Sequence, residues 1–186
     1  MSLQSKREWV LPKKKTKDIV EHILTIRKIE DRDLYLNPTI KNIPSYKKLF
    51  DSKKAAKKIV KSIENEDKIV IHGDYDADSI CASSLLWEFL YRDVSKFLDK
   101  KIDVVPYIPD RLEQGYGLTR DSLNDLVDLG ANLVITVDCG IRDKELINEY
   151  IKEKGLKFII TDHHQPPKNV LEGIKYPIVH QMYPEK

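Results

Sequence analysis

The stretch of sequence that decides the fold is IVIHGDYDAD, residues 69–78. It begins with three apolar β-branched residues, and a histidine, a glycine and three alternating aspartates follow them. A short apolar run bounded by turn residues is typical of a buried strand. The stretch therefore predicts a strand that ends in an acidic turn, with a helix following it through about residue 90.

Two later stretches have the same design. LVITVDCG (133–140) and FIITDHH (158–164) each place polar residues directly after an apolar run. Helical patterns separate the apolar runs, and strands that alternate with helices are typical of a parallel sheet. We expect strands at 68–73, 102–107, 132–137, 157–161 and 176–179, and helices at about 80–90, 119–130 and 141–154. The predicted fold class is α/β, a Rossmann-like parallel sheet with helices on both faces.

Two regions are expected in the chain. Residues 1–66 are predicted to form a basic, largely helical extension, and residues 67–186 to form the α/β domain. Within the extension we expect helices at 17–31 and 51–64, a loop at 34–44, and a helix cap at Asp51 or Ser52.

The charge of the chain is unevenly distributed. Residues 1–61 hold 17 Lys/Arg against 7 Asp/Glu, whereas the rest of the chain holds 15 against 23. A basic region beside an acidic one suits a protein that holds a phosphate backbone and binds metal elsewhere. Solvated helix faces are the alternative explanation of the lysine runs.

Composition excludes several classes of protein. The chain is 41% apolar and 33% charged, which is typical of a globular protein. No apolar run approaches the length of a bilayer span, and the Lys-rich start lacks an apolar signal core. We therefore expect a cytoplasmic protein without membrane contact, in which Cys81 and Cys139 are buried thiols.

The first acidic turn has the composition of a metal site. Asp74, Asp76 and Asp78 follow His72, and three carboxylates in one crevice would repel one another without a cation. Hard divalent ions bind carboxylate oxygens and also imidazole, so Mn²⁺ or Mg²⁺ fits these ligands. The alternative is an acidic turn that only caps the next helix.

The other two strand ends add candidate ligands, because ligands of α/β sheets bind at the carboxyl ends of the strands. Asp138 follows its strand directly, although an Asp there is often only a helix cap. Adjacent histidines point in different directions, so one of His163 and His164 could bind metal while the other contacts substrate. Asp162 could hold one imidazole in the required tautomer.

Together the three strand ends resemble motifs I, II and III of the DHH phosphoesterases. The resemblance implies two ions, Mn²⁺ or Mg²⁺: one on His72, Asp76 and Asp138, the other on Asp78, Asp138 and His163. It also implies that Asp74 is a ligand or an outer acceptor, and that His164 contacts the scissile phosphate and acts with Asp138 in catalysis.

A loop narrows the resemblance within the family. PDRLEQGYGL (109–118) looks like a segment of the RecJ single-strand DNA exonucleases, and LNP (36–38) is similar to their amino-terminal extension. Arg111 offers a planar fork for phosphate, and Tyr116 could stack on a base. A rigid turn with an ion pair between Arg111 and Glu113 is the alternative.

The RecJ resemblance implies 5′ to 3′ hydrolysis of single-stranded DNA in DNA repair and recombination. It further implies a monomer whose partners include single-strand-binding protein and a helicase. A phosphodiesterase for short oligonucleotides or cyclic dinucleotides is one alternative, and a non-catalytic scaffold with the DHH fold is another. A nucleotide-binding α/β domain is disfavoured, since the chain has neither a Gly-x-Gly-x-x-Gly nor a P-loop sequence.

The sequence departs from the family pattern in three places. Ser79 stands where a Gly is usual, and VHQMYP (179–184) does not match the Asn-Pro that often follows the third motif. The sequence also ends at Lys186, before the fourth motif and second domain that the resemblance implies. We therefore expect an amino-terminal fragment whose own activity is an open question.

Overall fold

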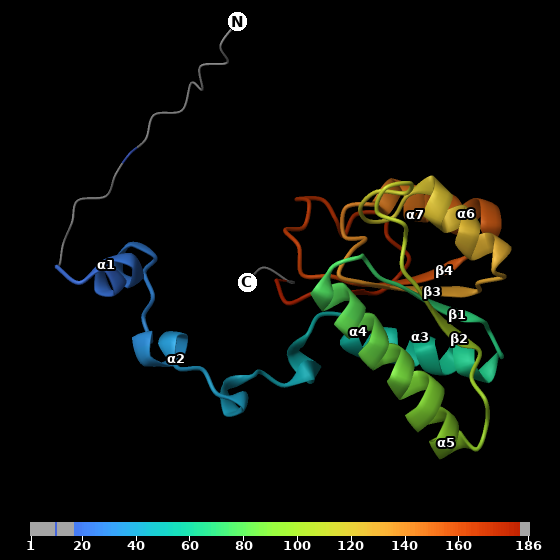
Figure 1. The fold of residues 1–186 in the computed structure, drawn as a ribbon, viewed down its shortest axis with the longest axis horizontal. Coiled ribbons are helices and arrows are strands. Elements are labelled where there is room, and N and C mark those ends of the chain that lie inside the picture. Colours follow the sequence, from blue (N-terminus) through green and yellow to red (C-terminus); the bar gives the residue numbers. More distant parts are fainter. Residues whose placement is uncertain (1–9, 11–16, 183–186) are drawn as a thin grey trace, which may run out of the picture. The chain divides into compact units, whose positions relative to one another are not determined.

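A five-stranded, wholly parallel sheet forms the centre of the fold (Figure 1). The computed structural model describes residues 10 and 17–182. The strand order is β2-β1-β3-β4-β5. The strands are β1 (Ile69–His72), β2 (Val104–Tyr107), β3 (Leu133–Val137), β4 (Lys157–Thr161) and β5 (Ile178–Val179). Each predicted strand is present, most of them one or two residues shorter at the ends than expected.

Helices cover both faces of the sheet. Figure 1 shows α6 (Arg120–Asp128) and α7 (Lys144–Lys154) on one face, and α3 (Ser52–Glu64) and α4 (Ala77–Glu88) on the other. A π-helical turn, η3 (Phe89–Val94), continues α4 into the short α5 (Ser95–Leu98). The predicted fold class, an α/β sheet with helices on both faces, is confirmed.

Alternate residues of the central strands enter two separate cores. Val70, Val134 and Phe158 pack in a cluster with Leu123 of α6 and Ile147 of α7. Their strand neighbours enter a second cluster with side chains of α3 and the α4–η3 helix: Ile69, Ile71, Leu133, Ile135, Ile159, Ala55, Ile63 and Leu90. Because both faces of the strands are buried, the strands read as continuous apolar runs.

The chain forms two compact units, Met1–Pro44 and Ser45–Lys186. The first contains α1 (Ile19–Ile26), α2 (Arg32–Leu36) and the 3₁₀ turn η1 (Ile40–Asn42). The prediction of one helix over 17–31 is wrong beyond α1, because Lys28 adopts a left-handed conformation with φ 55°. The prediction of a loop from residue 34 is also wrong in part, since Asp31 accepts a hydrogen bond from the Leu34 N–H and caps α2.

Three smaller expectations also need correction. The helix predicted from residue 141 begins at Lys144, after a turn closed by the Asp143 N–H and the Gly140 carbonyl at 3.2 Å. Asp51, which follows the 3₁₀ turn η2 (Tyr46–Lys48), occupies the N-cap position of α3 as expected, but its side chain makes no capping hydrogen bond and pairs with Lys54 at 2.6 Å. Cys139 is buried as expected, but Cys81 is exposed on α4.

None of the helices over 17–182 is both long and apolar enough to cross a bilayer.

Candidate metal centre

The three motifs meet at the carboxyl edge of the sheet. His72 is the last residue of β1, Asp138 follows β3 and Asp162 follows β4. These strands are neighbours in parallel register, with His72 beside Thr136 and Val137 beside Thr161. Residues that are far apart in sequence therefore come together at one edge, as the strand order requires.

Within residues 17–182, two sets of side chains lie close enough to hold a metal ion. Ligand atoms of Asp76, Asp78 and Asp138 lie within 4.8 Å of one another, and so do those of Asp138, His163 and His164. Asp138 belongs to both sets, and its Oδ1 lies 2.8 Å from His163 Nε2. The geometry thus places Asp138 where a bridging ligand would lie, between two groups of donors.

Asp138 reaches this position through a tight turn. It adopts φ 62°, a left-handed conformation that is uncommon for a residue other than glycine, and its N–H donates to the Thr161 carbonyl at 3.0 Å. Gly140 follows with φ 97°, and a Cβ there would lie 3.1 Å from Thr136 Oγ1. The turn therefore needs glycine at position 140 both for its conformation and for the close packing of β3.

Burial sets the electrostatics of Asp138. The side chain is 8% exposed, and burial, followed by the charges of Asp78 and Asp76, raises the pKa of its carboxyl. A carboxylate in these surroundings is destabilised unless a positive charge compensates it. Asp138 therefore gains more from a bound cation than a solvated aspartate would.

The first acidic turn combines a helix cap with exposed carboxylates. Asp76 Oδ1 accepts a hydrogen bond from the Ser79 N–H at 3.2 Å and caps α4, while Asp78 lies in the first turn of that helix. Both carboxylates are exposed, whereas Asp74 is buried and burial raises its pKa. Asp76 therefore caps α4, as the alternative interpretation expected, and it also belongs to the first close set of carboxylates.

Two buried polar atoms of this turn lack a hydrogen bond. His72 Nε2 and Asp74 Oδ1 have no hydrogen-bond partner among the residues that the structure describes. Burial lowers the pKa of His72 to about 4, so its imidazole is neutral at pH 7 and one ring nitrogen keeps a lone pair. Buried polar groups normally have partners, and a neutral imidazole with a carboxylate is a donor set that Mn²⁺ or Mg²⁺ accepts. The residues present therefore fit a divalent ion.

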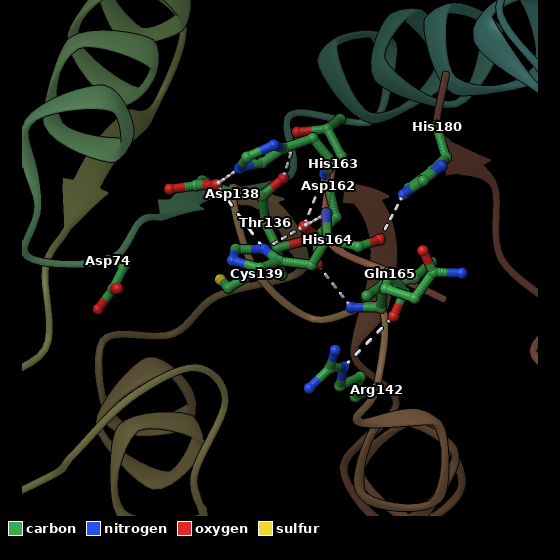
Figure 2. A network of polar contacts seen from close by, with 12 residues as sticks. Asp74, Thr136, Asp138, Cys139, Arg142, Asp162, His163, His164, Gln165 and His180 are labelled. Carbon is green, nitrogen blue, oxygen red and sulfur yellow. Dashed lines mark hydrogen bonds and ion pairs between the residues drawn. The ribbon is translucent and has the colours of Figure 1, made fainter. Parts of the chain in front are cut away.

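The Asp162–His164 turn is organised differently (Figure 2). Asp162 Oδ1 accepts hydrogen bonds from the N–H groups of His163 and His164 at 2.7 and 2.9 Å, and Oδ2 accepts from the Ile141 N–H at 3.0 Å. Oδ1 also lies 2.8 Å from His164 Nδ1. Asp162 therefore holds the backbone of the turn and one imidazole together, and it favours the tautomer with the proton on Nδ1.

The loop after β2 contributes two candidate substrate contacts. The Tyr116 hydroxyl lies 2.9 Å from His164 Nε2, and the Arg111 guanidinium lies 4.9 Å from the centre of the Tyr75 ring. No ion pair joins Arg111 to Glu113 in the described part of the chain. Burial, followed by the charge of Asp162, raises the pKa of Tyr116, so the hydroxyl keeps its proton.

A cavity of about 310 Å³ opens beside Asp138 and His163. Its lining includes the polar side chains of Asp78, Asp138 and His163 and the apolar side chains of Leu49 and Ala82. A cavity lined by carboxylate, imidazole and apolar side chains can hold a metal-bound phosphate together with the apolar face of a sugar or base.

The sequence of this domain matches a family model. Residues 68–183 match the DHH family, N-terminal domain. The chain belongs to the DHH family. This DHH-family chain is 40% identical over 116 residues to the single-stranded-DNA-specific exonuclease RecJ of Bacillus subtilis (strain 168), a stretch that covers 61% of the chain and 14% of the relative.

Other RecJ proteins match the DHH-family chain over more of its length. The single-stranded-DNA-specific exonuclease RecJ of Thermus thermophilus is 32% identical over 139 residues, which cover 75% of the chain and 19% of the relative. A crystal structure of exonuclease RecJ bound to manganese superposes with a TM-score of 0.63 and 30% identity, covering 77% of the chain and 34% of that structure. The chain spans less than a fifth of the length of these two curated relatives.

The structure brings most of the predicted site residues together, and it adds three. Neither close set of ligand atoms contains His72 or Asp74, although both flank the same turn. Ser79, expected to cause only a local adjustment, is fully buried; its hydroxyl accepts the Asp74 N–H and donates to the Val137 carbonyl at 3.3 Å. His180 and Gln181 contact the histidine turn and were not predicted. Their only sequence signal was the departure from the Asn-Pro pattern.

Proposed function

We propose that this DHH-family protein is a two-metal phosphodiesterase that degrades single-stranded DNA from its 5′ end. The observation that carries the proposal is the position of Asp138, which shares its carboxylate between two sets of ligand atoms at the carboxyl edge of the sheet. The two RecJ relatives are named as single-stranded-DNA-specific exonucleases, which supports the substrate class.

The proposed ligands are those that the family resemblance implies. His72, Asp76 and Asp138 would hold one ion, and Asp78, Asp138 and His163 the other, with Asp74 as a further buried carboxylate. Manganese in the RecJ crystal structure supports Mn²⁺ as one suitable ion. When bound, paired divalent ions lower the pKa of a water molecule and stabilise charge on the attacking and leaving oxygens of an in-line displacement.

The protein's own groups would orient the phosphate. Asp162 fixes the ring of His164, whose Nε2 faces the Tyr116 hydroxyl at 2.9 Å. With a proton on both ring nitrogens, His164 would donate from Nε2 to a phosphate oxygen that takes the place of this hydroxyl, and the Asp162 carboxylate would stabilise the positive charge on that ring. Arg111, stacked on Tyr75, would supply a planar donor for a neighbouring phosphate.

A lysine-rich helix supports a polyanionic substrate. Five lysines lie on α3, and they form like-charge pairs four residues apart that weaken an isolated helix. α3 also lacks an acidic residue in its first turn, where one would be favourable. Since Ala55 and Ile63 pack α3 into the core of the sheet domain, these charges are fixed on the domain, where a DNA backbone would neutralise them.

The wider biological role is part of the same proposal. We assign the protein to DNA repair and recombination, as a cytoplasmic monomer that acts with single-strand-binding protein and a helicase. The division into an extension at 1–66 and a DHH domain at 67–186 also belongs to the proposal. The family match begins at residue 68, whereas the compact unit begins at Ser45 because α3 packs on the sheet.

The test is an assay of the full-length gene product with Mn²⁺ on three substrates: 5′-labelled single-stranded DNA, the same DNA as duplex, and a dinucleotide. We expect loss of the single strand from its 5′ end. Asp138→Asn should lower the rate by more than about 100-fold, beyond the usual cost of losing an outer partner of a metal ligand. Asn tolerates a positive φ, so this variant changes the charge and not the turn.

Asp128→Asn is the matched control, because Asp128 is exposed at the end of α6, and it should keep the wild-type rate. Cleavage of the dinucleotide alone would replace the exonuclease with a small-substrate phosphodiesterase. Tight Mn²⁺ binding without cleavage of any substrate would favour a non-catalytic scaffold.

A further inference from the structure

The histidine turn is held from both sides of its backbone. The N–H groups of His163 and His164 donate to Asp162 Oδ1, as described above. Their carbonyl groups have partners as well: the His164 carbonyl lies 2.8 Å from His180 Nε2, and the His163 carbonyl accepts from Gln181 Nε2 at 3.3 Å (Figure 2 draws the His180 contact). All four main-chain polar groups of the two histidines are therefore satisfied by side chains.

The protonation state of His180 follows from its partners. Its Nδ1 accepts a hydrogen bond from the Met182 N–H at 3.0 Å, so Nδ1 carries no proton. The His164 carbonyl can only accept, so Nε2 must carry the proton and donate it. His180 is 1% exposed. Removing its N–H would leave the His164 carbonyl without this partner, and an unsatisfied buried acceptor costs its full desolvation penalty.

The edge strand explains how these two side chains reach the turn. The ladder between β4 and β5 extends past the strand ends, from the Ile160 N–H to the Pro177 carbonyl at 3.0 Å and from the Asp162 N–H to the Val179 carbonyl at 3.3 Å. Beyond this last main-chain bond, the side chains of His180 and Gln181 continue the pairing with the turn. Both line the cavity of about 310 Å³ together with His163.

We propose that His180 is a positioning residue that orients His164 for the substrate phosphate, and that Gln181 does the same, more weakly, for His163. This inference rests on the proposed phosphodiesterase function. The difference in strength follows from the geometry, since the His180 bond is short and buried whereas Gln181 is exposed and its bond is long. His180 acts through the backbone of His164 and touches no reacting atom.

The test combines hydrogen exchange of the His163 and His164 amides with steady-state hydrolysis of single-stranded DNA by the full-length gene product. His180→Leu fills the same space without a donor, and His180→Gln places an amide N–H close to the position of Nε2. We expect His180→Leu to speed exchange of both amides and to lower kcat by about 10-fold with KM unchanged. His180→Gln should restore both quantities, and Gln181→Ala should lower kcat by about 2-fold at most.

The two readouts separate this inference from the proposed function. Amide exchange reports whether His180 holds the histidine turn even if the protein hydrolyses no phosphodiester, because exchange requires neither metal nor substrate. If the two amides of His180→Leu exchanged at the wild-type rate, the positioning role of His180 would be wrong. The positioning role would also be wrong if folded His180→Gln did not restore the wild-type exchange rate. The faster exchange in His180→Leu would then come from lost packing and not from the lost N–H donor.

Discussion

Two turns at the same edge of the sheet differ in whether their polar groups have hydrogen-bond partners. In the turn after β1, His72 Nε2 and Asp74 Oδ1 are buried without a hydrogen-bond partner among the described residues. In the turn after β4, the N–H and carbonyl groups of His163 and His164 all have partners. Among the described residues, the first turn therefore leaves buried side-chain polar atoms without a partner, whereas the second turn has a partner for each of these main-chain groups.

The buried carboxyl groups of the two turns also differ in their hydrogen bonds. Burial raises the pKa of Asp74 and Asp138, so ionising these carboxyls is unfavourable in the folded protein without a cation. The Asp162 side chain is more buried than that of Asp138, but three N–H groups donate to its two oxygens. The comparison suggests that cations stabilise the first turn, while hydrogen bonds preorganise the second before any cation binds.

The largest expected effect comes from breaking the second turn. Asp162→Ala leaves the N–H groups of Ile141, His163 and His164 without this acceptor. Each buried donor that stays unsatisfied costs about 1–3 kcal/mol. We expect the free energy of unfolding to fall by about 4 kcal/mol in urea titrations with a chelator present. Exposed Asp128→Ala should change it by less than about 0.5 kcal/mol. A loss below about 1 kcal/mol for Asp162→Ala would remove the contrast between the turns.

The pH dependence of the metal-free protein tests the first turn. The pKa of His72 is lowered from 6.5 to about 4 in the folded state. A lowered pKa gives stability that is present above pH 6.5 and is lost as the pH falls from 6.5 towards 4, by up to about 3 kcal/mol. The raised pKa of Asp74 acts with the opposite sign, so wild type should be compared with His72→Gln, which does not titrate. Equal slopes over this window in the two proteins would contradict the prediction.

The smallest effect concerns the cation itself. A ligand that binds only the folded state stabilises it by about 2.7 kcal/mol at 100 times its Kd, and we expect Mn²⁺ to act in this way. Replacing both exposed carboxylates, Asp76→Asn with Asp78→Asn, should abolish this gain and leave the amide exchange of His163 and His164 unchanged. Thermal unfolding with and without Mn²⁺ measures the gain. An undiminished gain in the double variant would place the ion elsewhere.

Local patterns were sufficient to predict the sheet and most of its edge. Each strand lies in a short, mainly apolar run, so the five strands could be located without knowing what they pack against. Parallel strands share one carboxyl edge, so the meeting of Asp138 with His163 followed from the motif positions. The helix break at Lys28 was not predicted, because a lysine gives no local sequence signal for a left-handed conformation.

What the sequence alone determined is the α/β class, the strand positions and the set of carboxylates and histidines at one edge, because these depend on hydrophobic runs and on turn residues close to them in sequence. Tertiary structure decided which buried atoms have partners. The Ser79 hydroxyl on the Asp74 N–H and the His180 imidazole on the His164 carbonyl depend on backbone groups that packing brings near. Exposure was likewise decided by packing: Cys81 and Cys139 both lie in apolar sequence, yet only Cys139 faces the interior.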